Sequence, residues 1–572
     1  MRRSHHKLLV GAESLARRPR RLMQDTTRWV CWTMLACVAT SLSAETLQLD
    51  RFYPPVIARG DATTVTAEGK FPVWPPEVEA DRDDVSVKVD KESGKLSVSV
   101  NADAPPGAVW IRLRDQHSLS DLVPLIVSTA SVTLETEPNA KRSEADQLTL
   151  PTVVAGRLEK SGDSDAYRVS VKAGQRLVAS VTAHQVLRSP MDAVLQLSDV
   201  DGNVLIQSED VRGFDPQIVY TSERETELIL RIFAFPETPN QTIGFAGSQA
   251  MVYAIDVTTG PFIDHAVSEK HSGSDRAIAF GHNLSDEFDV QLSNVSQHSP
   301  PTVYADASIG WAWLSDDWVS AVAPTATRLA MGQSEIESLP VVVCGHILKP
   351  NQTDSYHMPV AAGIRYRAEV RSRPDGFLLD SKLVVVDSES GKQIASNDDI
   401  KRGGYDAGVE FTAEQEGRVE VRLSDTVNDS GPRHFYQLLI RAVTPGFQLS
   451  AAADRFVIQP ATPLEIPITI ERDSGFSGQL SIEATELPAG VTSAAVVSEP
   501  KGETAKSVKL NLVATDAAPG HYPFHIVGSA LDADEKTKGD PQNSVFALRP
   551  AISLDTFWLT IPPQPTPTQK QP

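Results

Sequence analysis

Short runs of apolar residues, or of alternating apolar and polar residues, recur along the chain and predict β-strands almost throughout. Asp201-Gly202 and Ser390-Gly391 stand between such runs, as the residues of hairpin turns do. No segment beyond the N-terminal region shows sustained apolar spacing of three and four residues, and the 39 prolines would interrupt many helices. The pattern predicts an all-β chain of tandem β-sandwiches. The clearest strand runs are 167–171, 177–181, 228–232, 366–370 and 419–423.

The chain also repeats itself at an offset of 189 positions without a gap. A module of about a hundred residues that occurs twice is typical of a string of domains and not of a single enzyme core. The residues that recur unchanged in the second copy include Leu150, Pro151, Val153, Val154, Gly156, Asp165, Tyr167, Ala173, Gly174, Arg176, Ala179, Val181, Gly202 and Asp210.

The N-terminal segment has the layout of a signal peptide. Basic residues dominate positions 1–28, an apolar run covers 29–39, and small residues follow up to Ala44. Because the apolar run is too short for a permanent membrane-spanning helix, we expect cleavage near Ala44. An uncleaved anchor, or a lipoprotein-like attachment at Cys37, stays open as an alternative.

Loss of this segment makes the chain more acidic. Residues 1–44 hold 8 basic and 2 acidic residues, so 45 basic and 72 acidic residues remain, a net charge of −27. Such a surface repels nucleic acid and anionic lipid and favours cations or basic partners. Cys344 would then be the one remaining cysteine, which excludes an internal disulfide. It lies in the apolar string 339–344, so we expect a small buried apolar residue and not a nucleophile.

The first copy contains the motifs Glu135-Thr136-Glu137-Pro138-Asn139, Leu150-Pro151, Gly162-Asp163-Ser164-Asp165-Ala166-Tyr167 and Ala173-Gly174-Gln175. These motifs resemble those of the bacterial pre-peptidase C-terminal domain. That family is a jelly-roll-like β-sandwich found beside secreted proteases and in extracellular multidomain proteins, and the resemblance covers about 133 to 258. The second copy matches less well, because it lacks the first of these motifs and has Gln352 where the first copy has Asp163.

Around the two copies stand Gly260-Pro261-Phe262-Ile263-Asp264, Gly281-His282-Asn283-Leu284 and Leu487-Pro488-Ala489-Gly490-Val491. These segments resemble the Ig-like spacers of large exported planctomycete-type proteins. We therefore expect the following organisation, given in chain order: a signal peptide at 1–44, an Ig-like sandwich at 45–131, the first repeat at 133–260, an Ig-like or irregular spacer at 261–338, a degenerate second repeat at 339–445, an Ig-like sandwich at 446–561 and a disordered tail at 562–572.

The resemblance implies a calcium site in the first repeat only. Some members of the family bind Ca²⁺ through the Glu-x-Glu-Pro-Asn segment and the following Asp-x-Asp. Hard oxygen ligands suit calcium, and alternate side chains of an extended segment point the same way. In the alternative interpretation the glutamates are solvated charges at a strand edge and the aspartates form a turn. The ligands implied are Glu135, Glu137, Asn139, Asp163 and Asp165.

Catalytic motifs are absent from the sequence: it contains no H-E-x-x-H, G-x-S-x-G, P-loop or C-x-x-C pattern. We expect structural roles for His282, His346 and His357. Trp311, Trp313 and Trp318 are expected in a spacer core, with an aromatic carbohydrate platform as the alternative.

These observations favour an exported, acidic, non-enzymatic protein that binds or scaffolds outside the cytoplasm, whether periplasmic, at the cell surface or secreted. Its partner would be an extracellular macromolecule, protein or polysaccharide, with no role for nucleic acid and no membrane span after cleavage. The alternative is an accessory or degenerate chain of a secreted hydrolase.

Overall fold

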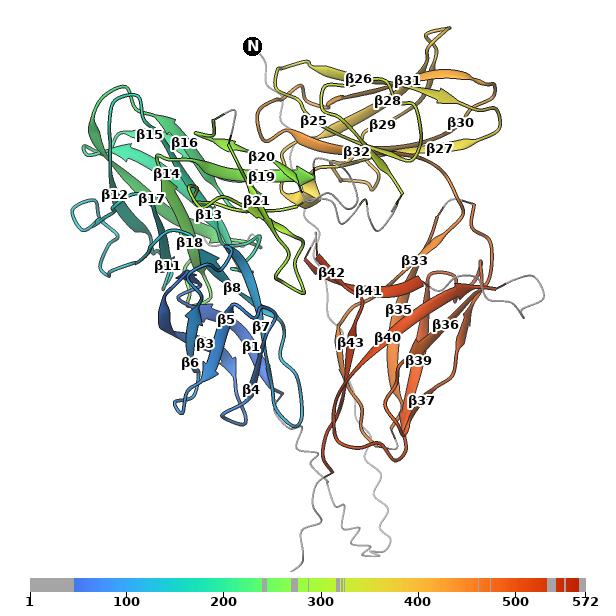
Figure 1. The fold of residues 1–572 in the computed structure, drawn as a ribbon, viewed down its shortest axis with the longest axis horizontal. Coiled ribbons are helices and arrows are strands. Elements are labelled where there is room, and N and C mark those ends of the chain that lie inside the picture. The colour runs from blue at the N-terminus through green and yellow to red at the C-terminus, as the bar shows by residue number, and fades with distance from the viewer. Residues whose placement is uncertain are drawn as a thin grey trace, which may run out of the picture. The chain divides into compact units, whose positions relative to one another are not determined.

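β-Sheets, in which most neighbouring strands are antiparallel, form nearly all of the regular structure in the computed structural model (Figure 1). The predicted all-β fold of tandem sandwiches is confirmed. The structure describes residues 46–238, 244–268, 276–285, 288–314, 319, 323, 325–460, 462–473, 475–531, 542–549 and 552–564. The expected signal peptide therefore lies outside the described residues, as does the tail beyond residue 564.

The N-terminal sandwich has two four-stranded sheets. Leu96 and Val109, on opposite sheets, are fully buried in the core between them. The first sheet has the order β1 (Gln48–Tyr53), β3 (Ala62–Lys70), β6 (Lys95–Val100) and β5 (Val85–Val89), and the second has the order β2 (Val56–Ala58), β8 (Val123–Ser128), β7 (Gly107–Arg114) and β4 (Glu77–Ala80).

The first repeat consists of two five-stranded sheets. Its β14–β15 hairpin turns at the predicted Asp201-Gly202. One sheet has the order β10 (Asp146–Gln147), β12 (Asp165–Val171), β17 (Thr226–Pro236), β14 (Met191–Asp199) and β15 (Val204–Ser208). The other has the order β16 (Gln217–Thr221), β13 (Arg176–Thr182), β18 (Val252–Thr258), β11 (Thr152–Arg157) and β9 (Val132–Leu134).

The two sheets of the second repeat have the same strand order as those of the first, except that no described strand of the second repeat corresponds to β10. The repeat in the sequence is thus a repeat of the fold. One strand, β24 (Thr327–Leu329), lies within the segment 261–338 that we expected to be spacer. It belongs to the sheet of the second repeat, because it pairs in parallel with β25 (Val341–His346) as β9 pairs with β11. The sheets are β26 (Thr353–Val360), β31 (Gly417–Asp425), β28 (Ser381–Asp387) and β29 (Gln393–Asn397), and β24 (Thr327–Leu329), β25 (Val341–His346), β32 (Phe435–Ala442), β27 (Arg365–Arg371) and β30 (Gly408–Thr412).

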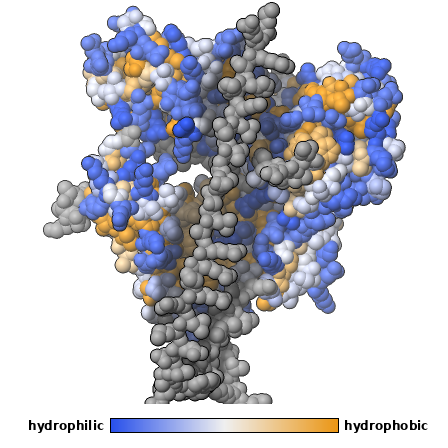
Figure 2. Space-filling model, turned by 180° about the vertical axis from the view of Figure 1, so that it is seen from behind, coloured by the Kyte–Doolittle hydropathy of each residue, from blue (hydrophilic) through white to orange (hydrophobic). Residues whose placement is uncertain are grey.

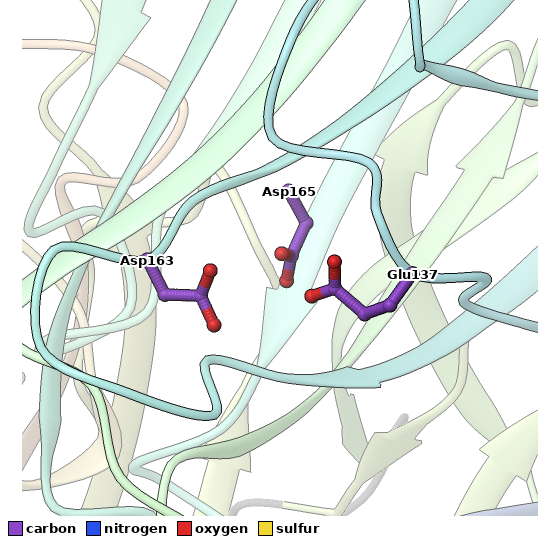
Figure 3. Close-up of side chains that lie close together, drawn as sticks. All are labelled: Glu137, Asp163 and Asp165. Carbon is purple, nitrogen blue, oxygen red and sulfur yellow. The ribbon is translucent and has the colours of Figure 1, made fainter.

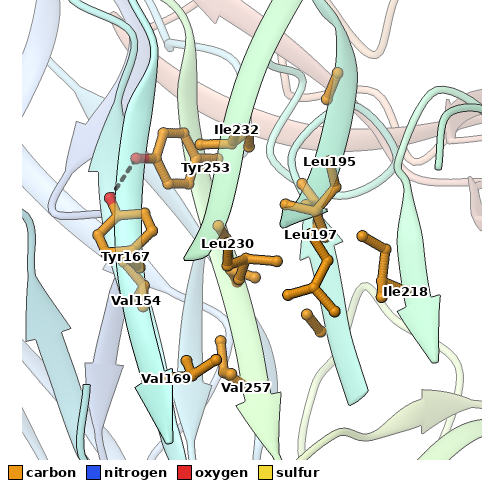
Figure 4. Packing of buried hydrophobic residues seen from close by; sticks show 14 of the residues in the cluster. Val154, Tyr167, Val169, Leu195, Leu197, Ile218, Leu230, Ile232, Tyr253 and Val257 are labelled. Atoms are coloured by element: carbon orange, nitrogen blue, oxygen red, sulfur yellow. Dashed lines mark hydrogen bonds between the residues drawn. The ribbon is translucent and has the colours of Figure 1, made fainter. Parts of the chain in front are cut away.

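Alternating side chains build the core of each repeat. On β12, Tyr167, Val169 and Val171 are buried, whereas Ser170 is exposed. Tyr167 and Val169 pack against residues of β17 and β18, such as Leu230 (Figure 4). Full burial of one such apolar side chain contributes about 1.5–3 kcal/mol, so the inward positions hold each strand in register.

Two further groups of strands complete the described chain. The spacer contains a two-stranded and a three-stranded sheet: β19 (Phe262–Ser268) and β20 (Ala277–His282), and β21 (Gln291–Ser293), β22 (Thr302–Tyr304) and β23 (Ala312–Trp313). The C-terminal sandwich contains β33 (Phe447–Ala451), β34 (Arg455–Val457), β35 (Leu464–Arg472), β36 (Leu480–Thr485), β37 (Val491–Ser493), β38 (Val496–Ser498), β39 (Ser507–Ala514), β40 (Gly520–Ala530), β41 (Gln542–Arg549), β42 (Ile552–Leu554) and β43 (Phe557–Ile561).

Hydrophilic residues prevail on the face drawn in Figure 2, where hydrophobic residues form separate patches. Val204 and Leu205 of the edge strand β15 are among the exposed apolar side chains. Within the described ranges, no helix is long and apolar enough to cross a membrane.

Candidate metal centre

A hydrogen-bonded pair of tyrosines lies in the core of each repeat. In the first repeat, the hydroxyl oxygens of Tyr167 on β12 and Tyr253 on β18 are 2.6 Å apart (Figure 4). In the second, those of Tyr356 on β26 and Tyr436 on β32 are also 2.6 Å apart. All four side chains are buried, so each hydroxyl needs its partner inside the protein.

A glycine makes room for each pair. A β-carbon at Gly156 would lie 2.4 Å from the hydroxyl oxygen of Tyr253, and one at Gly345 would lie 2.3 Å from that of Tyr436. No side chain fits at such distances without displacing the tyrosine. This close approach explains why glycine recurs at the offset of 189 positions.

Each tyrosine pair is also bonded to an aspartate at the beginning of the neighbouring strand. Tyr436 donates to Oδ2 of Asp354 at 2.6 Å, and Tyr253 donates to Oδ2 of Asp165. Asp354 is half-buried, whereas Asp165 is fully buried. The two repeats therefore share a tyrosine, tyrosine and aspartate chain, and they differ in what faces the other oxygen of the aspartate.

In the second repeat, the side-chain amide of Gln352 faces Oδ1 of Asp354. Nε2 of Gln352 donates to Oδ1 of Asp354 at 2.8 Å. Oε1 of Gln352 accepts a hydrogen bond from the backbone N–H of Leu348 at 2.8 Å. Both carboxylate oxygens of Asp354 thus accept a hydrogen bond from a protein side chain, Oδ1 from Gln352 and Oδ2 from Tyr436.

In the first repeat a carboxylate takes the place of this amide. Oδ2 of Asp163 accepts from the backbone N–H of Glu159 at 2.7 Å, and Glu159 corresponds to Leu348 at the offset of 189. A carboxylate has no hydrogen to donate to Asp165. Oδ1 of Asp165 is buried and has no hydrogen-bond partner among the described residues. A cation or a proton must supply the missing positive group.

Glu137 completes a cluster of three acids with these two aspartates. One carboxylate oxygen from each of Glu137, Asp163 and Asp165 lies within 4.8 Å of the others. Figure 3 shows the three carboxylates turned toward one another, with Asp165 between the other two. Glu137 is exposed and the aspartates are buried, so the cluster is reached from the side of Glu137.

Asn139 lies next to this cluster and is completely buried. Its backbone N–H donates to Oε2 of Glu137 at 3.2 Å, and its carbonyl accepts from the N–H of Ala166 at 3.1 Å. Neither Oδ1 nor Nδ2 of its side chain has a hydrogen-bond partner in the described part of the chain. A buried amide without partners is costly, and its oxygen is a ligand type that calcium accepts.

Glu135, also implied as a ligand, lies in a different network. Its Oε1 accepts from the hydroxyl of Tyr53 at 3.0 Å and from the backbone N–H of Arg157 at 2.9 Å. Its Oε2 is 3.2 Å from the hydroxyl of Tyr253. Glu135 therefore touches the tyrosine pair, and the three-acid cluster does not include it.

Burial and mutual repulsion shift the acids toward their protonated forms. Burial raises the pKa of Asp165 to about 9, and the negative charge of Glu135 adds to the rise. Burial also raises the pKa of Glu135 to about 7, against the hydrogen bonds from Tyr53 and Arg157. A bound cation would favour the ionised carboxylates instead.

The donor set fits calcium. It consists of three carboxylates and one amide oxygen, all hard oxygen ligands, and two of the oxygens lack any protein donor among the described residues. The described part of the second repeat offers no such set, because Gln352 stands in place of Asp163 and donates a hydrogen bond to Asp354.

The other candidate residues have structural surroundings. Cys344 is buried, as expected, and packs with Val267, Phe377 and Phe435. Burial and the nearby charge of His265 lower the pKa of His346 to about 3.

Trp311 and Trp313 pack partly buried against a core cluster, and their ring centroids are 5.3 Å apart. Trp318 lies outside the described residues.

Sequence reasoning missed two tyrosines of the first repeat's network and one of the second's. Tyr253 and Tyr436 are 183 positions apart, so a comparison at an offset of 189 does not align them. Tyr53 belongs to another sandwich, and no local pattern connects it with Glu135.

No protein-family model matches the chain, and no curated protein matches its sequence. Among solved structures, the pre-peptidase C-terminal domain of a collagenase from Bacillus anthracis is 16% identical, covering 19% of this chain and 93% of that one at a TM-score of 0.16. Fibronectin(III)-like modules of CbhA from Clostridium thermocellum are 10% identical, covering 35% of this chain and 87% of theirs at a TM-score of 0.12. Escherichia coli alpha-2-macroglobulin is 10% identical, covering 90% of this chain and 53% of that one at a TM-score of 0.15. At these TM-scores neither a family nor a function follows for this chain.

Proposed function

We propose that this chain is an exported, non-catalytic multidomain protein that binds or scaffolds extracellular macromolecules, and that calcium stabilises its first repeat. One observation carries the calcium part of this proposal: Asp163 faces Asp165 where Gln352 donates to Asp354. In the second repeat an amide hydrogen of Gln352 satisfies Asp354. In the first repeat Asp165 requires a positive charge from outside the chain.

Glu137, Asp163 and Asp165 would hold the ion through one carboxylate oxygen each, and Asn139 through Oδ1. Calcium would supply the positive charge that keeps the buried carboxylates ionised. It would also leave the hydroxyl hydrogen of Tyr253 available to Asp165 or Glu135, its two carboxylate neighbours.

Export and binding are supported by the sequence. The basic leader and the apolar run at 29–39 have the layout of a signal peptide, and the net charge of −27 after residue 44 suits a surface that meets cations or basic partners. A non-catalytic role is supported by the missing nucleophile and metalloprotease motifs and by the repeated sandwich fold. Turnover of a peptide, ester or glycoside substrate that a single substitution abolishes would contradict this role.

Hydrogen exchange of the full chain, read by mass spectrometry, tests the calcium site. With calcium in place of chelator, we expect slower exchange in β11, β12 and β18 of the first repeat and unchanged exchange in β25, β26 and β32 of the second. At about a hundredfold excess over the dissociation constant the gain is roughly 2.7 kcal/mol, which slows exchange about a hundredfold where exchange requires the repeat to open. Asp165→Ala should remove the slowing of exchange by calcium. Asp163→Asn, which keeps the shape of the side chain and removes its charge, should weaken this slowing. Equal slowing in both repeats, or none in the first, would show that the acid cluster is not the calcium site.

A further inference from the structure

A cavity of about 110 Å³ lies beside the spacer strands, and no residue of the acid cluster lines it. Its walls come from β13, β18, β19, β23 and β27 and from neighbouring segments, all within the compact unit Glu45–Pro572. One water molecule needs roughly 10–15 Å³ of such space, so the cavity admits a ligand of at least one ring. Pockets of this kind, with apolar walls and a few polar groups, are typical binding sites.

Aromatic side chains form the apolar part of the wall. Trp311 and Trp313 meet edge to face, with an angle of 66° between their rings, and Phe262 and Phe377 line the same cavity. Trp311 also lines a neighbouring cavity of about 10 Å³, as do Thr182 and Asp256. The indole faces offer flat apolar surface to a ligand.

Most charges in the wall are already paired. Nη1 of Arg433 lies 2.6 Å from Oδ2 of Asp264, and Nη2 of Arg371 lies 2.8 Å from Oδ1 of Asp375. These two ion pairs neutralise four of the charged residues that line the cavity. A free cation or anion entering here would meet charges of both signs and gain little from them.

Asp256 and Arg212 are the two lining charges outside those pairs. No hydrogen bond to the carboxylate of Asp256 comes from the residues that the structure describes, and Asp256 is half-buried in the cavity wall. Arg212 makes a single long side-chain hydrogen bond within the described chain, 3.4 Å to Oγ of Ser180. Among the charged residues of the wall, Asp256 thus offers an acceptor and Arg212 a donor beside the aromatic surface.

We propose that this cavity binds a neutral saccharide residue. Each sugar hydroxyl both donates and accepts, so neighbouring hydroxyls can donate to Asp256 and accept from Arg212. The apolar C–H face of the ring packs on Trp311. A neutral ligand suits a wall in which positive and negative groups balance. The inference gives a ligand class to the binding role proposed above and rests on that role, but it does not depend on calcium.

An array of immobilised neutral oligosaccharides, probed with the full chain, tests this assignment. We expect retention on at least one of them, with equal affinity in calcium and in chelator. For that oligosaccharide, Asp256→Asn and Trp311→Ala should raise the dissociation constant at least tenfold. Asp192→Asn and Trp74→Ala, which change the same residue types outside the cavity, should leave it unchanged.

Three results would overturn the saccharide site. The first is no retention on any oligosaccharide, and the second is retention that Asp256→Asn does not weaken. Because Asp256→Asn preserves the shape of the side chain, its result holds even where Trp311→Ala fails to fold. The third is binding of a protein or basic peptide in place of saccharides, which would leave the general binding role intact and refute this ligand class.

Discussion

The hydroxyl of Tyr53 donates a hydrogen bond to Oε1 of Glu135 at 3.0 Å and thereby joins the N-terminal sandwich to the first repeat. Arg157 strengthens the same junction, because its guanidinium carbon lies 3.6 Å from the centre of the Tyr53 ring and its Nη1 lies 2.9 Å from Oε1 of Glu68. Glu135 also touches Tyr253, which in turn bonds to Asp165. The junction and the acid cluster are therefore neighbours through a chain of hydrogen bonds.

Tyr53→Phe should weaken this junction. The substitution removes the donor and keeps the ring beneath Arg157, so we expect a loss of about 1.5 kcal/mol, typical of a hydrogen bond to a charged group. Chemical denaturation of the full chain measures it. Tyr405→Phe is the matched control, since its hydroxyl makes no hydrogen bond within the described residues and its ring lies over Arg373. An equal effect of both substitutions would rule out a specific role for the Tyr53 hydroxyl.

The stability of the first repeat should fall as the pH rises in chelator, and bound calcium should offset this fall. In chelator, Asp165 takes up a proton on folding, because its pKa rises from about 3.9 in the unfolded chain to about 9 in the folded one. Its contribution is complete below pH 4 and is lost as the pH rises through 9. With calcium the carboxylates are ionised and binding releases protons, so the stabilisation by calcium should grow from pH 5 to pH 9.

Thermal unfolding at several pH values, in calcium and in chelator, measures this difference. A first repeat that becomes more stable in chelator as the pH rises would contradict the buried, protonated Asp165.

Gly345→Ala should destabilise the second repeat. The new methyl group would lie 2.3 Å from the hydroxyl oxygen of Tyr436 and force the tyrosine pair apart, at a cost of about 1–3 kcal/mol. Gly417→Ala, on β31 of the same repeat, meets no atom within 4 Å and should change stability little. Urea denaturation of the two variants tests the point. If Gly345→Ala proves as stable as the control, the tyrosine pair is not tightly packed.

The sequence pattern predicted the strands well because burial alternates along them. The run 167–171 lies within β12, and the turns at Asp201-Gly202 and Ser390-Gly391 join β14 to β15 and β28 to β29. Inward apolar residues and turn residues are local signals, so a single chain is enough to find them.

The site was harder to predict because it combines residues that are far apart in the sequence. Of the five implied ligands, Glu137, Asp163 and Asp165 come together, and Asn139 is buried beside them. Glu135 is engaged instead by Tyr53, which is 82 positions away in another sandwich. No spacing rule can reveal such a contact.

Calcium titration of the full chain and of its Asp163→Gln variant, followed by calorimetry, tests the central claim most directly. The substitution would give Asp165 an amide donor at position 163, as Gln352 donates to Asp354 in the second repeat. We predict that the unsubstituted chain binds calcium in the first repeat, and that Asp163→Gln abolishes this binding while the variant stays at least as stable in chelator. Calcium binding that survives Asp163→Gln unchanged, or no binding to the unsubstituted chain, would contradict the account.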